Sequence, residues 1–513
     1  MLPRRCLGQV LHRVRLRFLG WEAQDSINNS VAISKTNSRI GRVSAKTITR
    51  KIRIKRANVP PAVPTAYIRG MDKPQAILIY AERDSRRLQY SVEVLFRHIL
   101  GYDYNLTFHR DEVLNCEGPL VVYGVDPMSF EKGISIRAVD LLYHRGVSPM
   151  DQDPALWGDL PVFFRTHRIY DVPFDLFAAA FYLLSRYEEY LPHATDAHGR
   201  PDPAATLRGQ RDWLDIALVD RYALRLAALI QQRWPDYPQP VRPYRFVPTI
   251  DIDQMYAYRH KPPLRQFLGA MRDLSAGRLA EVGQRTRVCF FKHADPFDTY
   301  ALMEHWHQAA GVRPLFFIQM GDYGGYDQAH PPTSRAFIEC VLHLQGEGMV
   351  GLHPSYRSRG DVNILIKEKE TLEAQLGTAI TRSRQHFLCL KLPDTLIQLH
   401  EVGIHDEYSF GYAGATGFRS GTATPHPFYD PLGDRVLPIT LHPTCVMDVT
   451  LMQYLRLSPT EAVERVRKLV KEVRDVGGQM LTLWHNSSLS GHGAWQGWEG
   501  VYPAVLKEAA GND

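Results

Sequence analysis

Short apolar, β-branched runs alternate with segments of helical spacing along most of the chain. In the first half, Ala76–Ala81 and Pro119–Tyr123 are predicted strands, and Leu88–Leu100 between them has the spacing of a helix. Two further helices are predicted at Phe174–Leu191 and Val219–Trp234. The proline cluster Pro235–Pro240 then marks a predicted domain boundary. We therefore expect a smaller accessory α/β domain over residues 65–240.

Beyond residue 240, predicted strands alternate with predicted helices. Strands are expected at Tyr244–Ile250, Val288–Phe291, Pro314–Ile318, Met349–Leu352, His386–Leu390, Val436–Ile439 and Met480–Trp484. Helices are expected at about 298–310, 333–346, 362–376, 393–402 and 459–476. The last helix has Ser458 as its predicted N-cap and Gly477 at its exit. This alternation predicts a parallel sheet, open or closed into a (β/α) barrel, over residues 241–513.

The composition is that of a globular protein, with 44% hydrophobic and 23% charged residues among 513. The net charge of +6 is unevenly distributed, since residues 1–58 hold 14 Lys and Arg against two acids and the rest holds 47 against 53. We interpret residues 1–64 as a basic flexible arm without a specific nucleic-acid partner. Its charge alone would suit contact with phosphates or an anionic membrane, but a solvated tail, or a start codon placed too far upstream, is the favoured interpretation. Because the chain has no apolar stretch of about 20 residues, no transmembrane segment is expected. Residues 1–20 make a poor secretory signal, so a cytoplasmic location is expected.

Charged and imidazole side chains stand where several predicted strands end. They are Asp251, Asp253, His353, Arg384, His386 and His485. Asp251 and Asp253 are two residues apart on an extended segment, so their carboxylates share a face and suit a metal ligand or a tuned acid–base pair. Each residue alone also fits a structural role, as a loop acid or a buried histidine. Since the carboxyl ends of parallel strands meet at one rim of a barrel, we expect these side chains to share a pocket.

This order of residues resembles the polysaccharide deacetylase family, whose members have a distorted (β/α) barrel of the NodB type. The resemblance covers residues 244–505. It implies that Asp251 is the catalytic base and Asp253 a metal ligand, matching the first motif of the family. It also implies that His353 binds the metal, that Arg384 orients the base and that His485 is the catalytic acid. The segment around 174–190 resembles an uncharacterised N-terminal domain that accompanies such barrels in bacterial proteins.

The family's activity is implied with the fold. The resemblance implies a divalent metal, with Zn²⁺ expected and Co²⁺, Ni²⁺ or Mn²⁺ as alternatives. It implies a hydrolase of non-peptide carbon–nitrogen bonds that removes acetyl groups from an N-acetylated sugar in a glycan or glycan precursor, with O-deacetylation left open. Candidate substrate-binding residues are Asp295, Tyr408, Arg419 and Trp484.

One position departs from the family pattern. The second metal-binding histidine of the family falls on Arg357, whose guanidinium cannot bind a metal. His386 is the expected substitute ligand, with His293 as the second choice. If neither reaches the metal, the alternative function is a non-enzymatic carbohydrate-binding or polysaccharide-assembly protein on the same fold.

Overall fold

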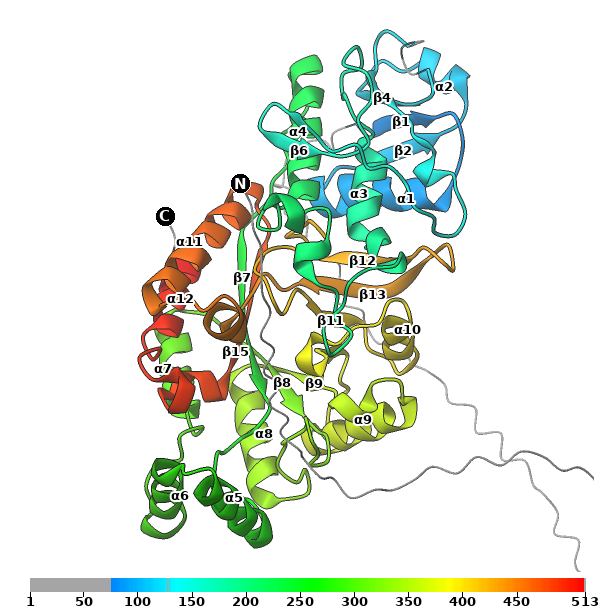
Figure 1. The fold of residues 1–513 in the computed structure, drawn as a ribbon. Coiled ribbons are helices and arrows are strands. Elements are labelled where there is room, and N and C mark those ends of the chain that lie inside the picture. The colour runs from blue at the N-terminus through cyan, green and yellow to red at the C-terminus, as the bar shows by residue number, and fades with distance from the viewer. Residues whose placement is uncertain (1–74, 127, 129, 512–513) are drawn as a thin grey trace, which may run out of the picture. The chain divides into compact units, whose positions relative to one another are not determined.

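The computed structural model describes residues 75–126, 128 and 130–511, which form an α/β protein (Figure 1). The predicted basic arm, residues 1–64, lies outside the described residues. The strands form a four-stranded sheet, a nine-stranded sheet and a two-stranded sheet. The first two sheets carry most of the helices, so the predicted α/β class is confirmed.

The four-stranded sheet is parallel, with the order β2-β1-β3-β4. Its strands are β1 (Ile77–Ala81), β2 (Tyr104–Thr107), β3 (Leu120–Gly124) and β4 (Ile134–Arg137). The helices of this region are α1 (Arg86–Glu93), α2 (Arg110–Leu114), α3 (Leu176–Leu184) and α4 (Leu218–Arg233), and the small hairpin is β5 (Ala155–Trp157) and β6 (Leu160–Val162). A π-helical turn continues α1 to Leu100, which confirms the helical segment predicted there.

Helix α3 is shorter than predicted, because it ends at Leu184 instead of Leu191. The hydroxyl of Ser185 donates to the Phe181 carbonyl, and Arg186 then adopts a left-handed conformation with φ of 54°. This turn brings the buried Arg186 guanidinium within 2.8 Å of the Glu189 carboxylate, which also accepts from Arg419. Burial raises the pKa of Glu189, but Arg419 and Arg186 lower it to about 2 overall.

Replacing Glu189 with glutamine is expected to lower the free energy of unfolding by about 3–5 kcal/mol, because the buried Arg419 guanidinium would lose its carboxylate and Arg186 would keep only that of Glu188. Urea denaturation measures this change. Glu464→Gln, which removes an exposed partner of Arg467, is the matched control and is expected to change stability by about 0–1 kcal/mol. Equal, small effects of both substitutions would contradict the prediction.

The nine-stranded sheet has the order β12-β13-β11-β10-β9-β8-β7-β15-β14. Its strands are β7 (Arg245–Ile252), β8 (Leu315–Gln319), β9 (Met349–His353), β10 (Arg382–Ser383), β11 (Asp406–Phe410), β12 (His426–Asp430), β13 (Arg435–Pro443), β14 (Val446–Met447) and β15 (Gln479–His485). All neighbours are parallel except β12 and β13. Strand β13 pairs with β11, and after it the Cys445 N–H donates to the Leu481 carbonyl before β14 pairs with β15. One segment thus joins both ends of the parallel sheet, which curls into a distorted barrel as predicted.

The helices of the barrel region follow its strands. They are α5 (Pro263–Ser275), α6 (Leu279–Phe291), α7 (Tyr300–Ala309), α8 (Arg335–Glu347), α9 (Val362–Leu376), α10 (Asp394–Glu401), α11 (Pro459–Val476) and α12 (Val501–Ala510). The predicted caps of α11 are confirmed, since Ser458 and Glu461 form a capping box and Gly477 is left-handed with φ of 60°.

Two predicted strands are wrong. Val288–Phe291 is the last turn of α6, and His386–Leu388 is a short 3₁₀ turn that follows β10. Both are apolar runs of four or five residues, a length at which hydrophobicity does not distinguish a strand from a buried turn of helix.

Two large clusters of buried apolar side chains pack against the four-stranded and the nine-stranded sheets. One lies almost wholly within residues 77–237 and the other almost wholly within residues 250–509. The domain boundary at residue 240 stays a prediction.

Candidate functional site

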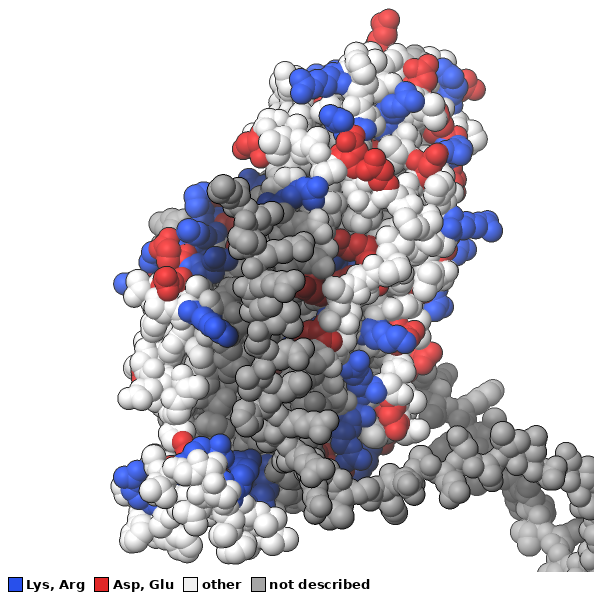
Figure 2. All heavy atoms as spheres, viewed as in Figure 1, with Lys and Arg blue, Asp and Glu red and all other residues white. Residues whose placement is uncertain are grey.

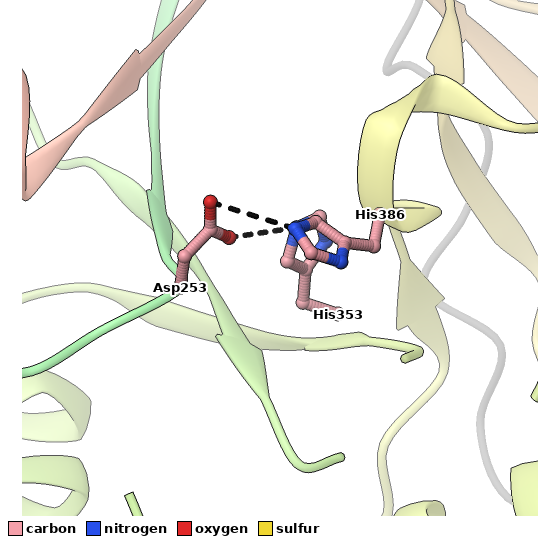
Figure 3. Close-up of side chains that lie close together, drawn as sticks. All are labelled: Asp253, His353 and His386. Atoms are coloured by element: carbon pink, nitrogen blue, oxygen red, sulfur yellow. Dashed lines mark ion pairs between the residues drawn. The ribbon is translucent and has the colours of Figure 1, made fainter. Parts of the chain in front are cut away.

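The three predicted metal ligands lie together at one rim of the barrel (Figure 3). Asp253 follows β7, His353 ends β9 and His386 begins the turn after β10. Their ligand atoms all lie within 4.8 Å of one another. The Asp253 carboxylate is 3.1 Å from Nε2 of His353 and 3.6 Å from Nε2 of His386. One carboxylate and two imidazoles form a donor set that suits a catalytic divalent metal with a position left open.

Hydrogen bonds orient both imidazoles toward Asp253. Nδ1 of His353 donates to the Arg384 carbonyl at 2.5 Å, which directs Nε2 toward the Asp253 carboxylate. Nδ1 of His386 lies 3.0 Å from the Asp327 carboxylate, an outer partner of the kind that metal-binding histidines have.

The Asp253 carboxylate is the negative group of the cluster. Its Oδ1 is buried and, among the described residues, has no hydrogen-bond partner, although Nε2 of His353 lies 3.1 Å away. Burial lowers the pKa of His386, but Asp253 and Asp327 raise it to about 9. The site therefore attracts positive charge, and a divalent cation between the three side chains fits the donors present.

Asp251 and Arg384 form a buried pair beside the cluster. Arg384 Nη1 is 3.0 Å from the Asp251 carboxylate, and the guanidinium is also fixed by the Thr249 hydroxyl and the Tyr408 carbonyl. The other carboxylate oxygen of Asp251 is 3.8 Å from Nε2 of His353. Arg384 thus orients one oxygen of Asp251 and leaves the other at the metal cluster.

His485 approaches the cluster from the neighbouring strand β15. Its Nδ1 is 2.9 Å from the Asp448 carboxylate, and its Nε2 is 3.8 Å from Asp253. Burial lowers the pKa of His485, but Asp448, followed by Asp253 and Asp251, raises it to about 10. A histidine that is charged at neutral pH and fixed through Nδ1 is suited to donate a proton from Nε2.

The structure does not bring the four predicted substrate-binding residues to this pocket. Asp295 accepts from the backbone N–H groups of Ala257, Tyr258, Arg259 and Phe297. Tyr408 is buried and stacks on His442, Arg419 pairs with Glu189, and Trp484 packs against Tyr502 in the core. Tyr408 and Trp484 do lie on strands, β11 and β15, whereas Asp295 follows α6 and Arg419 lies in the loop between β11 and β12. Each of the four side chains has a structural partner instead.

Two further positions of the sequence analysis lie away from the metal cluster. His293 is exposed after the end of α6, so His386 is the histidine that joins the cluster. Arg357 is exposed and lines a neighbouring cavity, with its backbone N–H donating to Asp327.

The sequence analysis missed Asp327 and Asp448, which hold the two histidines. Asp448 directly follows β14, so an acidic residue at a strand end was a usable signal, but a two-residue strand leaves almost no hydrophobic pattern. Asp327 lies in the loop after β8, eight positions past its last residue, and nothing in its local sequence marks it.

Comparisons with known proteins give limited similarity. A family of unknown function, DUF7033, matches residues 77–235, and no curated protein matches the chain. A presumed polysaccharide deacetylase from Mycobacterium smegmatis is similar at 16% identity and a TM-score of 0.35, covering 53% of this chain and 85% of its own. A polysaccharide deacetylase from Bacillus cereus is similar at 10% identity and a TM-score of 0.26, covering 52% of this chain and 87% of its own. A CE4 family pseudoenzyme from Bacillus anthracis is similar at 10% identity and a TM-score of 0.25, covering 52% of this chain and 61% of its own. At these scores the similarities carry no argument about activity.

Proposed function

We propose that this protein is a metal-dependent hydrolase that removes acetyl groups from an N-acetylated sugar in a glycan or glycan precursor. The observation that carries the proposal is the convergence of Asp253, His353 and His386, with an Arg384-bound carboxylate and an Asp448-bound histidine beside them. These are the groups that acyl transfer to water needs: a cation site, a base and an acid.

Each side chain has a role that follows from its position. A divalent cation, when bound, supplies Lewis-acid polarisation of an acyl carbonyl and lowers the pKa of water. Asp251, oriented by Arg384, accepts the proton of the attacking water. His485 donates the proton of Nε2 to the leaving amine. Asp253, His353 and His386 hold the cation, and because two ligands are imidazoles we propose Zn²⁺ ahead of Co²⁺, Ni²⁺ or Mn²⁺.

The alternative, a non-catalytic carbohydrate-binding protein, rested on Arg357 in place of a histidine. His386 supplies a third ligand from another strand end, and Asp327 orients it. Because His386 can replace the missing histidine ligand, we favour the enzyme over the non-catalytic protein.

Metal analysis and acetate release test the proposed function together. We expect the purified full-length protein to bind one equivalent of Zn²⁺ and to release acetate from N-acetylated oligosaccharides, with both lost on chelation and restored by the metal. His386→Ala is expected to lose metal and activity, whereas the matched control His293→Ala, an exposed histidine, keeps both. Unchanged metal content in His386→Ala, or full metal loading without acetate release, would contradict the proposal.

A further inference from the structure

Helix α5 has its apolar face turned toward solvent. Leu264, Phe267, Leu268, Met271 and Leu274 have the i, i+3, i+4, i+7 spacing of one helix face, which in a globular protein normally packs on the core. Here these five side chains are 48% to 69% exposed, and Asp273 is the buried residue of the helix.

The next helix extends this apolar surface. Helices α5 and α6 pair with each other as a hairpin joined by Ala276–Arg278, so the C-terminal end of α6 returns toward the start of α5. Phe290 and Phe291 at that end are 79% and 69% exposed, and Leu279 at the other end is 67% exposed. We call residues 259–292 the hairpin. It concentrates eight large exposed apolar side chains, far more than isolated surface residues require.

The hairpin carries a net positive charge, although residues 59–513 as a whole carry a net negative charge. Residues 259–292 hold eight Lys and Arg against two acids, whereas residues 59–513 as a whole hold 47 against 53. Both acids of the hairpin are already paired, Asp273 with Arg278 and Arg285, and Glu281 with Tyr258 and His492. Figure 2 shows Lys and Arg side chains beside a broad uncharged surface at the lower end of the view, where Figure 1 places α5 and α6.

We propose that the hairpin docks the protein on the surface of an anionic phospholipid membrane. A helix that combines an exposed apolar face with flanking Lys and Arg lies in the membrane interface, with apolar side chains among the acyl chains and cations at the head groups. The proposed contact is peripheral. In the part of the chain that the structure describes, no helix has the length and apolarity to cross a bilayer.

Charge argues for lipid rather than a second copy of the chain. A symmetric contact would bring two hairpins with a net charge of +6 each against one another, which opposes dimerisation through this face. The segment of residues 1–58 is basic as well, so its charge does not favour covering the hairpin.

The hairpin follows the metal cluster closely in sequence and structure. Only nine residues separate Asp253 from Pro263, the first residue of α5, and Asp295 fixes this connection by accepting from three of its backbone N–H groups. A cavity of about 900 Å³ adjoins α5, with Lys261, Arg265 and Arg357 in its lining. Docking through the hairpin would bring this rim of the barrel to glycans held at the membrane surface. The docking itself does not depend on the proposed function.

Vesicle co-sedimentation of the full-length protein tests the docking. We expect binding to vesicles of phosphatidylcholine mixed with phosphatidylglycerol, and much weaker binding to phosphatidylcholine alone. The triple variant Phe267→Ser, Phe290→Ser, Phe291→Ser is expected to reduce binding to the anionic vesicles about tenfold or more. The control variant Leu114→Ser, Leu156→Ser, Leu432→Ser removes three similarly exposed side chains elsewhere and should bind as the wild type does.

The salt dependence of vesicle binding distinguishes binding through the hairpin from binding through the basic segment of residues 1–58. Binding by charge alone disappears at high ionic strength, whereas binding that buries phenylalanine side chains is weakened but persists, and the triple variant should lose that remainder. Absence of wild-type binding, or binding that the triple variant retains, would overturn the proposal. A wild-type dimer that the triple variant converts to a monomer would assign the surface to a second copy instead.

Discussion

Replacing Asp251 with asparagine is expected to lower the rate of acetate release by about 10²–10⁴, because the amide cannot accept the proton of the attacking water. Metal content should stay at the wild-type level, since the ligands of the cluster are Asp253, His353 and His386. The substitution preserves the shape of the side chain and an acceptor for Arg384. Stopped assays of acetate release and elemental analysis of the same preparation measure the two quantities.

Asp253→Asn is the matched control for Asp251→Asn, because it makes the same chemical change two residues further along the chain, directly after β7. We expect it to weaken metal binding as well as activity, since an amide is a poorer metal ligand than a carboxylate. Identical metal loss in both variants would assign Asp251 to the ligands, and undiminished activity of Asp251→Asn would exclude it as the base.

Replacing His485 with glutamine is expected to lower acetate release from an N-acetylated sugar by about 10²–10⁴, because the leaving amine must be protonated. An acetate ester with a phenolate leaving group needs no such proton, so its hydrolysis should fall much less. The ratio of the two losses is the readout. Equal losses for amide and activated ester would contradict a role of His485 as the acid.

Asp448 is expected to act as a positioning residue for His485. Asp448→Asn removes the charge that raises the pKa of His485 to about 10, so the pKa should fall. A general acid works only while protonated, so the decline of kcat/KM with rising pH should begin at a lower pH in the variant than in the wild type. A profile that keeps its alkaline limb would indicate a merely structural Asp448.

Much of the fold was predictable because its signals are local. The helix Pro459–Val476 has a capping box at Ser458 and a left-handed glycine at Gly477, and both work within a few residues. The strands β7, β8, β9 and β15 were recognised from their short apolar runs. A run of the same length failed at Val288–Phe291, where the last turn of α6 buries Val288 and exposes both phenylalanines.

The candidate site was predictable where residue spacing alone decides the geometry. Asp251, on β7, and Asp253, directly after it, point to the same side because an extended chain repeats every two residues. The role of His386 was predicted from its spacing to Arg384 on a strand, yet it reaches Asp253 from a 3₁₀ turn.

The order of the elements and the types of side chain at the strand ends follow from short stretches of sequence, because hydrophobic period and capping act over neighbouring residues. Which of those side chains face one another depends on the folded barrel. Barrel closure joins His485 to Asp448 and Arg384 to Asp251, while Tyr408, Arg419 and Trp484 turn into the core. These contacts link positions 37 to more than 130 residues apart, and their geometry depends on the register and curvature of the whole sheet.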